Sequence, residues 1–294
     1  GTYADVLSFE PTDLEAHLKM VELHEQLGNP DDALDLLKTA STLDGLDPEM
    51  NVELWRRIAR NAEERHLETA MEHWEFVRES LASDEEALES LRIIYRQLEQ
   101  FDRLRDLLAD MAQQDLQDRA DVLMELAELL TNVLPDSEGA IAVLENVLEL
   151  DAGRLDAMDL LSGHFSQNGQ WERLAGMLTS KLEILDDGEK LPVWKELADC
   201  FENMDDLDGA ISARQEVLTL EPALEGNYDQ LCEIFERRSD WGAQVACLET
   251  KLDVLDDAGR SVVCGEIGRI YEDKLEDLSS AFSFFSLGWE LGQE

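Results

Sequence analysis

The chain has 294 residues and carries 68 acidic side chains against 24 basic ones, a formal net charge of −44 at pH 7. Binding to nucleic acid or to an anionic membrane needs clustered lysine and arginine, so this composition argues against both and favours a basic protein partner. A general adaptation of the surface to salt remains an equal alternative, because composition alone does not separate the two.

A step of 70 residues organises the chain. Apolar and aromatic positions recur in register at Leu91, Leu161 and Leu231, and at Phe101, Trp171 and Trp241. A fixed period of this kind is typical of a solenoid, in which each repeat buries its apolar face by stacking on its neighbours. No linker rich in Gly, Pro or Ser interrupts the sequence, so we expect residues 1–294 to form a single solenoid domain.

Within each period the apolar residues recur at steps of three and four, which is the helical period. Glycine, asparagine and proline mark the turns, as at 28–30 and 168–169. The pattern predicts eight helix–turn–helix repeats, and the first helix of the first repeat begins near Pro11. Their ranges are 12–45, 47–82, 84–116, 119–152, 154–187, 190–222, 224–257 and 260–294.

The clearest repeat has Leu197, Ala198 and Phe201 in its first helix (helix A), Ala210 in its second (helix B) and Pro222 at its end. These residues resemble the tetratricopeptide repeat family, as a degenerate tandem array of the bacterial type. The resemblance implies an all-α fold, a right-handed α-α superhelix of about eight repeats. It also implies a non-enzymatic scaffold for protein–protein interaction.

The repeats alternate between two types. Those around Leu91, Leu161 and Leu231 depart from the family pattern, and we expect Phe101, Trp171 and Trp241 to begin their second helices. A pair of repeats duplicated as a block explains this alternation.

In the resembling family, ligands lie along a concave surface formed by side chains of the first helices. The corresponding positions here are Asp121, Glu125, Glu128, Asp156, Asp159, Glu196, Asp199, Glu202, Asp229, Glu233, Glu236 and Glu266. All twelve are negative and only Lys195, Arg237 and Arg269 interrupt them, so the mapping predicts an acidic groove that binds a segment rich in lysine or arginine. A plain solvated face is the alternative interpretation of the same carboxylates.

No signature of catalysis or metal binding occurs. The sequence has no GxSxG, P-loop, GxGxxG, HExxH or EF-hand motif. We therefore expect no enzymatic activity, no cofactor and no metal. Cys232 and Cys264 occupy apolar helix positions, which favours a packing role. No apolar run reaches the length of a spanning helix and no signal peptide is visible, so we expect no membrane insertion and a cytoplasmic location.

Neither end resembles a cap. The last repeat ends in Phe282, Phe284, Phe285, Leu287 and Trp289, which form an apolar face for another helix to cover unless they pack inward. We therefore expect a fragment of a longer array, or an end that docks a partner or self-associates end to end. Two further hypotheses stay open beside the scaffold: a regulatory or sensor region of a larger enzyme, and a nucleic-acid mimic that binds a basic protein.

Overall fold

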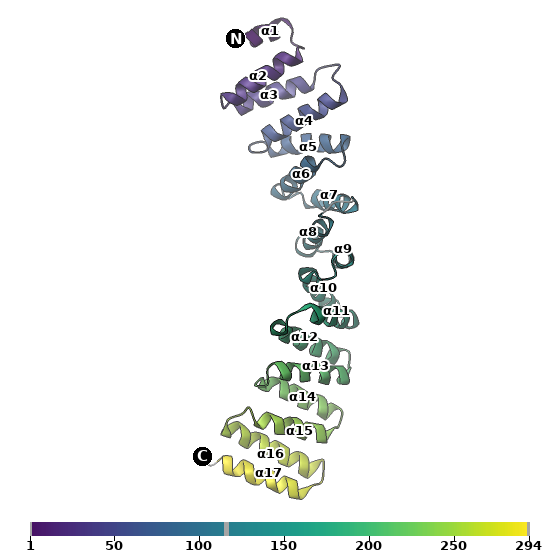
Figure 1. Cartoon of the computed structure of the whole chain (residues 1–294), viewed down its shortest axis with the longest axis vertical. Coiled ribbons are helices and arrows are strands. Elements are labelled where there is room, and N and C mark those ends of the chain that lie inside the picture. The colour runs from purple at the N-terminus through teal and green to yellow at the C-terminus, as the bar shows by residue number, and fades with distance from the viewer. Residues whose placement is uncertain (1, 115–117, 293–294) are drawn as a thin grey trace. The chain divides into compact units, whose positions relative to one another are not determined.

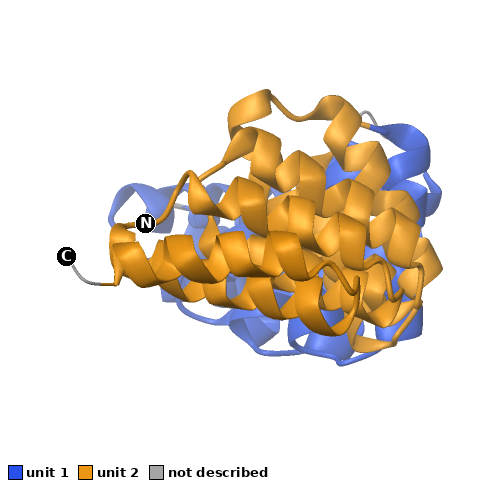
Figure 2. Cartoon of the chain, turned by 90° about the horizontal axis from the view of Figure 1, so that it is seen from below, with its two compact units in different colours: residues 1–152 blue, residues 153–294 orange. Residues whose placement is uncertain are grey.

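The computed structural model describes residues 2–114 and 118–292, and within these ranges it contains 17 α-helices, one short 3-10 helix and no strand (Figure 1). They divide into two compact units, residues 1–152 (unit 1) and residues 153–294 (unit 2), coloured separately in Figure 2. The all-α, repeat-based fold class is confirmed. The expectation of a single domain stays a prediction.

The described residues of unit 1 form nine helices, of which the last eight make four helix pairs. They are α1 (Thr2–Phe9), α2 (Leu14–Gln26), α3 (Pro30–Ser41), α4 (Pro48–Ala62), α5 (Leu67–Ser80), α6 (Glu85–Gln97), α7 (Phe101–Gln113), α8 (Arg119–Asn132) and α9 (Ser137–Leu150). The start predicted near Pro11 is close to that of α2. The sequence analysis missed α1, a short helix outside the repeat pattern that packs on α2.

Unit 2 consists of four helix pairs, with a 3-10 turn at Asp187–Glu189. Its helices are α10 (Leu155–Gln167), α11 (Trp171–Ile184), α12 (Lys190–Asn203), α13 (Leu207–Leu220), α14 (Glu225–Arg237), α15 (Trp241–Leu252), α16 (Asp257–Asp273) and α17 (Leu278–Leu291). As predicted, Phe101, Trp171 and Trp241 are the first residues of α7, α11 and α15. Each helix packs chiefly on its neighbours in sequence.

Aspartates begin many of these helices. In the described residues, eight of them accept a hydrogen bond from a backbone N–H of the first turn: Asp13, Asp47, Asp84, Asp136, Asp206, Asp240, Asp256 and Asp277. A carboxylate at this position satisfies a free N–H and faces the positive end of the helix dipole. Asp256 explains why the last pair begins at Asp257 rather than at residue 260. Part of the acidic composition is therefore structural.

Three turns inside helix pairs, one in each 70-residue block, share one backbone conformation. Glu99, Gly169 and Ser239, which follow one another at the 70-residue step, have φ angles of 54°, 64° and 57°. This left-handed conformation closes the carboxyl end of a helix and costs little only for glycine. The period of the sequence therefore extends to the backbone of its turns.

Candidate protein-binding surface

The twelve predicted groove residues all lie on first helices of pairs. Asp121, Glu125 and Glu128 belong to α8 of unit 1, and the other nine belong to α10, α12, α14 and α16 of unit 2. Asp229, Glu233 and Glu236 are spaced four and three residues apart on α14. Side chains with this spacing share one helix face, so α14 presents a row of three carboxylates.

Lysines of the second helices neutralise part of this set. Lys181 of α11 pairs with Asp159 of α10, and Lys251 of α15 pairs with Asp229 of α14. The two pairs lie 70 residues apart and repeat each other. Both lysine side chains are largely buried, with 15% and 10% exposure, while the aspartates remain open to solvent. The sequence analysis counted these carboxylates as free charges.

Arg214 of α13 neutralises two more. Its side chain is only 3% exposed and contacts Asp199 at 2.8 Å and Glu202 at 2.5 Å, both on α12. It also donates to the side-chain oxygens of Asn227 and Gln230 on α14, at 3.3 Å and 2.6 Å. A buried guanidinium needs such partners because an unpaired charge in the interior is costly. Arg214 therefore ties three helices together beneath this surface.

Glu125 in unit 1 is the most enclosed of the twelve. Its carboxylate lies between the guanidinium groups of Arg92 and Arg96 on α6, and its side chain is 13% exposed. Glu128, one turn further along α8, is exposed and lines a cavity of about 290 Å³ together with Phe101 and Leu129. Two arginines thus already occupy Glu125, which leaves it few atoms to offer a ligand.

Five of the predicted carboxylates have no such partner. Within the described residues no basic nitrogen lies within 4 Å of Glu128, Glu196, Glu233, Glu236 or Glu266. The pKa of Glu196 is raised by partial burial and by the nearby carboxylates of Asp159 and Asp199, against the opposing effect of Lys181. Acidic residues of α10 and α12, the first helices of successive pairs, therefore lie near one another, while the predicted groove stays a prediction.

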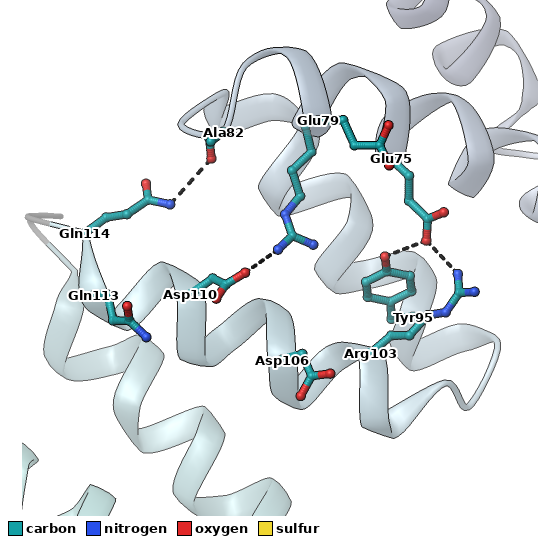
Figure 3. A pocket seen from close by; sticks show the side chains of 10 residues that line it. Glu75, Glu79, Ala82, Tyr95, Arg103, Asp106, Asp110, Gln113 and Gln114 are labelled. Carbon is teal, nitrogen blue, oxygen red and sulfur yellow. Dashed lines mark hydrogen bonds and ion pairs between the residues drawn. The ribbon is translucent and has the colours of Figure 1, made fainter.

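A cavity of about 740 Å³ in unit 1 was not foreseen (Figure 3). It lies between α5 and α7, with Tyr95 of α6 beside it. The carboxylate of Glu75 accepts hydrogen bonds from the Tyr95 hydroxyl at 2.7 Å and from Arg103 at 2.6 Å, and Arg78 pairs with Asp110. These polar contacts bridge the two helices across the cavity.

The sequence does contain a signal for this cavity. Residues 51–119 carry 10 basic and 17 acidic side chains, which makes them the stretch closest to charge balance. At the 70-residue step Tyr95 is replaced by Phe165 and Phe235, so the hydroxyl group belongs to this repeat alone. Comparing the blocks position by position would have singled it out.

The last helix combines both arrangements that were considered for its aromatic residues. Phe284 stacks on Tyr271 of α16, with ring centroids 5.7 Å apart. Phe282 and Trp289 are instead 73% and 72% exposed. The apolar face of α17 is therefore only partly covered by α16.

Two kinds of feature are absent from the described part of the chain. No group of three or more His, Cys, Asp or Glu side chains there is placed to hold a metal ion. No helix there is both long and apolar enough to cross a membrane.

No protein-family model and no curated protein matches the sequence, but solved structures match the fold. A chain in the structure of Naa15/Naa10 bound to HypK-THB aligns with 99% of this chain at a TM-score of 0.55 and 15% identity. This chain spans 47% of that one. YrrB, a TPR protein with an unusual peptide-binding site, aligns with 64% of this chain and 93% of its own, at a TM-score of 0.40 and 15% identity. MamA aligns with 60% of this chain and 94% of its own, at a TM-score of 0.41 and 17% identity.

The fold is an array of stacked helix pairs, which the chain shares with the matching chain of the Naa15/Naa10 structure. Its helix pairs follow the predicted repeat ranges, and Ala198 and Ala210 of the best-matching repeat are fully buried. At identities this low the likeness extends to the fold alone. The functional argument for this array must come from its own surface.

Proposed function

We propose that this array is a non-enzymatic protein-interaction scaffold, and that unit 2 binds a basic segment of a partner along α12 and α14. One observation carries the proposal. Burial raises the pKa of Glu196, and the nearby carboxylates of Asp159 and Asp199 raise it further, while the ammonium group of Lys181 lowers it. A cationic side chain at this point would relieve the repulsion between carboxylates.

The internal ion pairs reduce the number of carboxylates that are free to contact a ligand. Asp159, Asp199, Glu202 and Asp229 already contact Lys181, Arg214 or Lys251. Glu196, Glu233, Glu236 and Glu266 carry the uncompensated charge. We therefore assign the ligand contacts to this second set, and assign to the paired set the positioning of the surface.

The energy available from such contacts limits the ligand. Exposed ion pairs contribute about 0 to 1 kcal/mol each, and salt screens them over about 8 to 10 Å. A useful affinity therefore needs several successive contacts, which an extended basic segment supplies and a single cation does not. The matching Naa15/Naa10 structure is itself a complex of proteins, which supports a protein as the class of ligand.

The test is a binding titration with a fluorescein-labelled peptide of alternating arginine and glycine, followed by anisotropy at several salt concentrations. The surface variant carries Glu196→Gln, Glu233→Gln and Glu236→Gln. The control variant carries Glu183→Gln, Glu216→Gln and Glu249→Gln, three exposed positions on the second helices α11, α13 and α15. Both variants lose three negative charges, so they differ only in where those charges lie.

We expect binding to weaken about tenfold or more in the surface variant, since three contacts of about 0.5 kcal/mol each are lost. The control variant should bind within about twofold of the unmodified protein. Equal weakening in both would show that the peptide responds to net charge, and would overturn the proposed surface. The regulatory-region and nucleic-acid-mimic hypotheses, self-association through the last helix and a cytoplasmic location all stay predictions.

A further inference from the structure

Two thiols face each other inside the helix pair α14–α15. Asp229 of α14 pairs with Lys251 of α15, which fixes the register of the two helices. One turn back along α15, the sulfur of Cys247 lies 3.8 Å from the carbonyl oxygen of Tyr228. Cys232 follows Tyr228 by four residues on α14, so the register brings Cys232 and Cys247 opposite each other.

The surroundings hold the two sulfurs together. Cys232 and Cys247 pack in one apolar cluster with Val245, Leu248 and Ile267, and each thiol shifts the pKa of the other. Cys232 is buried and Cys247 is partly open to solvent. A small oxidant therefore reaches Cys247 first, with the second thiol already beside it.

We propose that Cys232 and Cys247 form an oxidisable dithiol, which closes to a disulfide between α14 and α15 when the protein meets a peroxide. This inference does not depend on the proposed ligand surface. It gives Cys232 and Cys247 a role in reversible disulfide formation, in addition to the packing role that the sequence suggested for Cys232.

The environment decides which thiol reacts first. The hydrogen bond from Cys232 and, to a lesser degree, the ammonium group of Lys251 lower the pKa of Cys247, while burial opposes them. The same hydrogen bond and burial raise the pKa of Cys232. The thiolate is the reactive form of cysteine, so Cys247 is the nucleophile and Cys232 the resolving thiol.

The chemistry balances in two steps. The Cys247 thiolate attacks one oxygen of hydrogen peroxide, the O–O bond breaks, and an S–O bond forms as hydroxide leaves and takes up a proton. Cys232 then attacks the sulfur of this sulfenic acid. The S–S bond forms, the S–O bond breaks, and the departing oxygen leaves as water with the Cys232 proton. The two thiols supply two electrons, which reduce one peroxide to two waters.

The preceding 70-residue block of the chain can be compared with the cysteine pair. Seventy residues earlier the same positions hold Ser162 and Met177, while the ion pair Asp159–Lys181 is kept. The helix-pair geometry therefore does not require two cysteines here. The remaining cysteines differ as well: the Cys200 thiol contacts the Trp171 carbonyl oxygen at 3.0 Å, and burial raises the pKa of Cys200 to about 11.

The experiment treats the purified chain with hydrogen peroxide in molar excess, blocks free thiols under denaturing conditions and maps the tryptic digest without reduction. Trypsin cleaves after Arg214, Arg237, Arg238 and Lys251, so Cys232 and Cys247 fall in separate peptides, 215–237 and 239–251. We expect these two peptides to be linked after treatment and separated by dithiothreitol. Cys200 and Cys264 should be recovered as blocked free thiols.

Variants define the order of the steps. In Cys232→Ser the link is lost and dimedone should label Cys247, because its sulfenic acid has no resolving thiol. The control pair Cys200→Ser and Cys264→Ser should form the link as the unmodified chain does. If unmodified, fully folded protein keeps both Cys232 and Cys247 alkylatable after peroxide, or if the link joins other cysteines, the inference is wrong. That mapping needs no variant, so it stands even where a substitution disturbs folding.

Discussion

Arg214 and Asn227 bind each other twice across the boundary between two repeats. The Arg214 guanidinium donates to the side-chain oxygen of Asn227 at 3.3 Å, and the Asn227 amide donates to the backbone carbonyl of Arg214 at 2.8 Å. Both residues are 2% exposed. Because α13 ends one helix pair and α14 begins the next, this reciprocal contact fixes how the two pairs stack.

The change Asn227→Ala tests that contact. It leaves a buried carbonyl and one guanidinium N–H without their partner, so we expect the free energy of unfolding to fall by about 1 to 3 kcal/mol. Urea denaturation followed by circular dichroism measures it. Asn203→Ala, which removes an exposed amide from α12, is the control and should cost less than about 0.5 kcal/mol. Similar losses in both variants would contradict a special role for Asn227.

The raised pKa of Glu196 predicts a pH-dependent stability. The folded protein holds the proton of Glu196 more tightly than the unfolded chain, whose ordinary pKa is 4.5. Its stabilising contribution is therefore full below pH 4.5 and is lost as the pH rises through the raised value. Glu196→Gln should stabilise the fold at pH 7 by about 0.5 kcal/mol, the size of an exposed charge interaction.

The same Glu196→Gln change should give no stabilisation near pH 3.5, where the glutamate is already neutral. Urea midpoints at the two pH values, with Glu183→Gln as the exposed control, measure the difference. A stabilisation that is equal at both pH values would mean that charge is not its cause.

The left-handed turns predict opposite effects for two matched substitutions. Ser239→Gly should raise the free energy of unfolding by about 1 kcal/mol, because glycine adopts a φ of 57° without the clash of a side chain. Gly169→Ala should lower it by a similar amount, although an added Cβ would make only an ordinary contact, at 3.9 Å from Nε1 of Trp171. Thermal melts of both variants check the sign, and a shift in the same direction for both would be inconsistent with this explanation.

Removing the Tyr95 hydroxyl should lower the free energy of unfolding of unit 1. Tyr95→Phe removes the hydrogen bond to the Glu75 carboxylate, so we expect a loss of about 1.5 to 3 kcal/mol, as for hydrogen bonds to charged groups. The fold should persist, because phenylalanine occupies the matching positions 165 and 235. Urea unfolding of the variant measures the loss, and a change below about 0.5 kcal/mol would show that the hydroxyl contributes little.

The alkaline pH dependence provides a second readout for Tyr95. Burial and Glu75 raise the pKa of Tyr95 above its ordinary 10.0, because both disfavour the phenolate. The neutral hydroxyl therefore contributes its full stability below pH 10, and that contribution is lost as the pH rises through the raised value. The difference in stability between the unmodified chain and Tyr95→Phe should shrink accordingly.

The sequence predicted the helix pairs because their determinants are local and repeated. The helical spacing, the turn glycines and the 70-residue register located the starts of α7, α11 and α15. The helix α1 lies outside that register and was missed. Its residues have no counterpart elsewhere in the chain against which to read them.

The helices that carry the groove carboxylates could be predicted from the sequence, but which carboxylates are neutralised by a lysine could not. Helix spacing placed Asp159 and Asp229 on first helices, but their partners Lys181 and Lys251 lie 22 residues further along. Which of the few cations reaches which carboxylate depends on how the two helices pack, and a residue count does not contain that information. The cavity beside Tyr95 depends likewise on the separation of α5 and α7.

Lys181 and Lys251 have a consequence for the kind of basic segment that the surface accepts. Each already pairs with an aspartate near the assigned ligand contacts, so an ammonium group is present there before a ligand binds. An incoming lysine adds a second point charge, whereas a guanidinium group can place two parallel N–H donors on one carboxylate. We therefore expect arginine peptides to bind more tightly than lysine peptides of equal length and charge, which a paired titration would measure. The surface should therefore discriminate between basic side chains by their shape as well as by their charge.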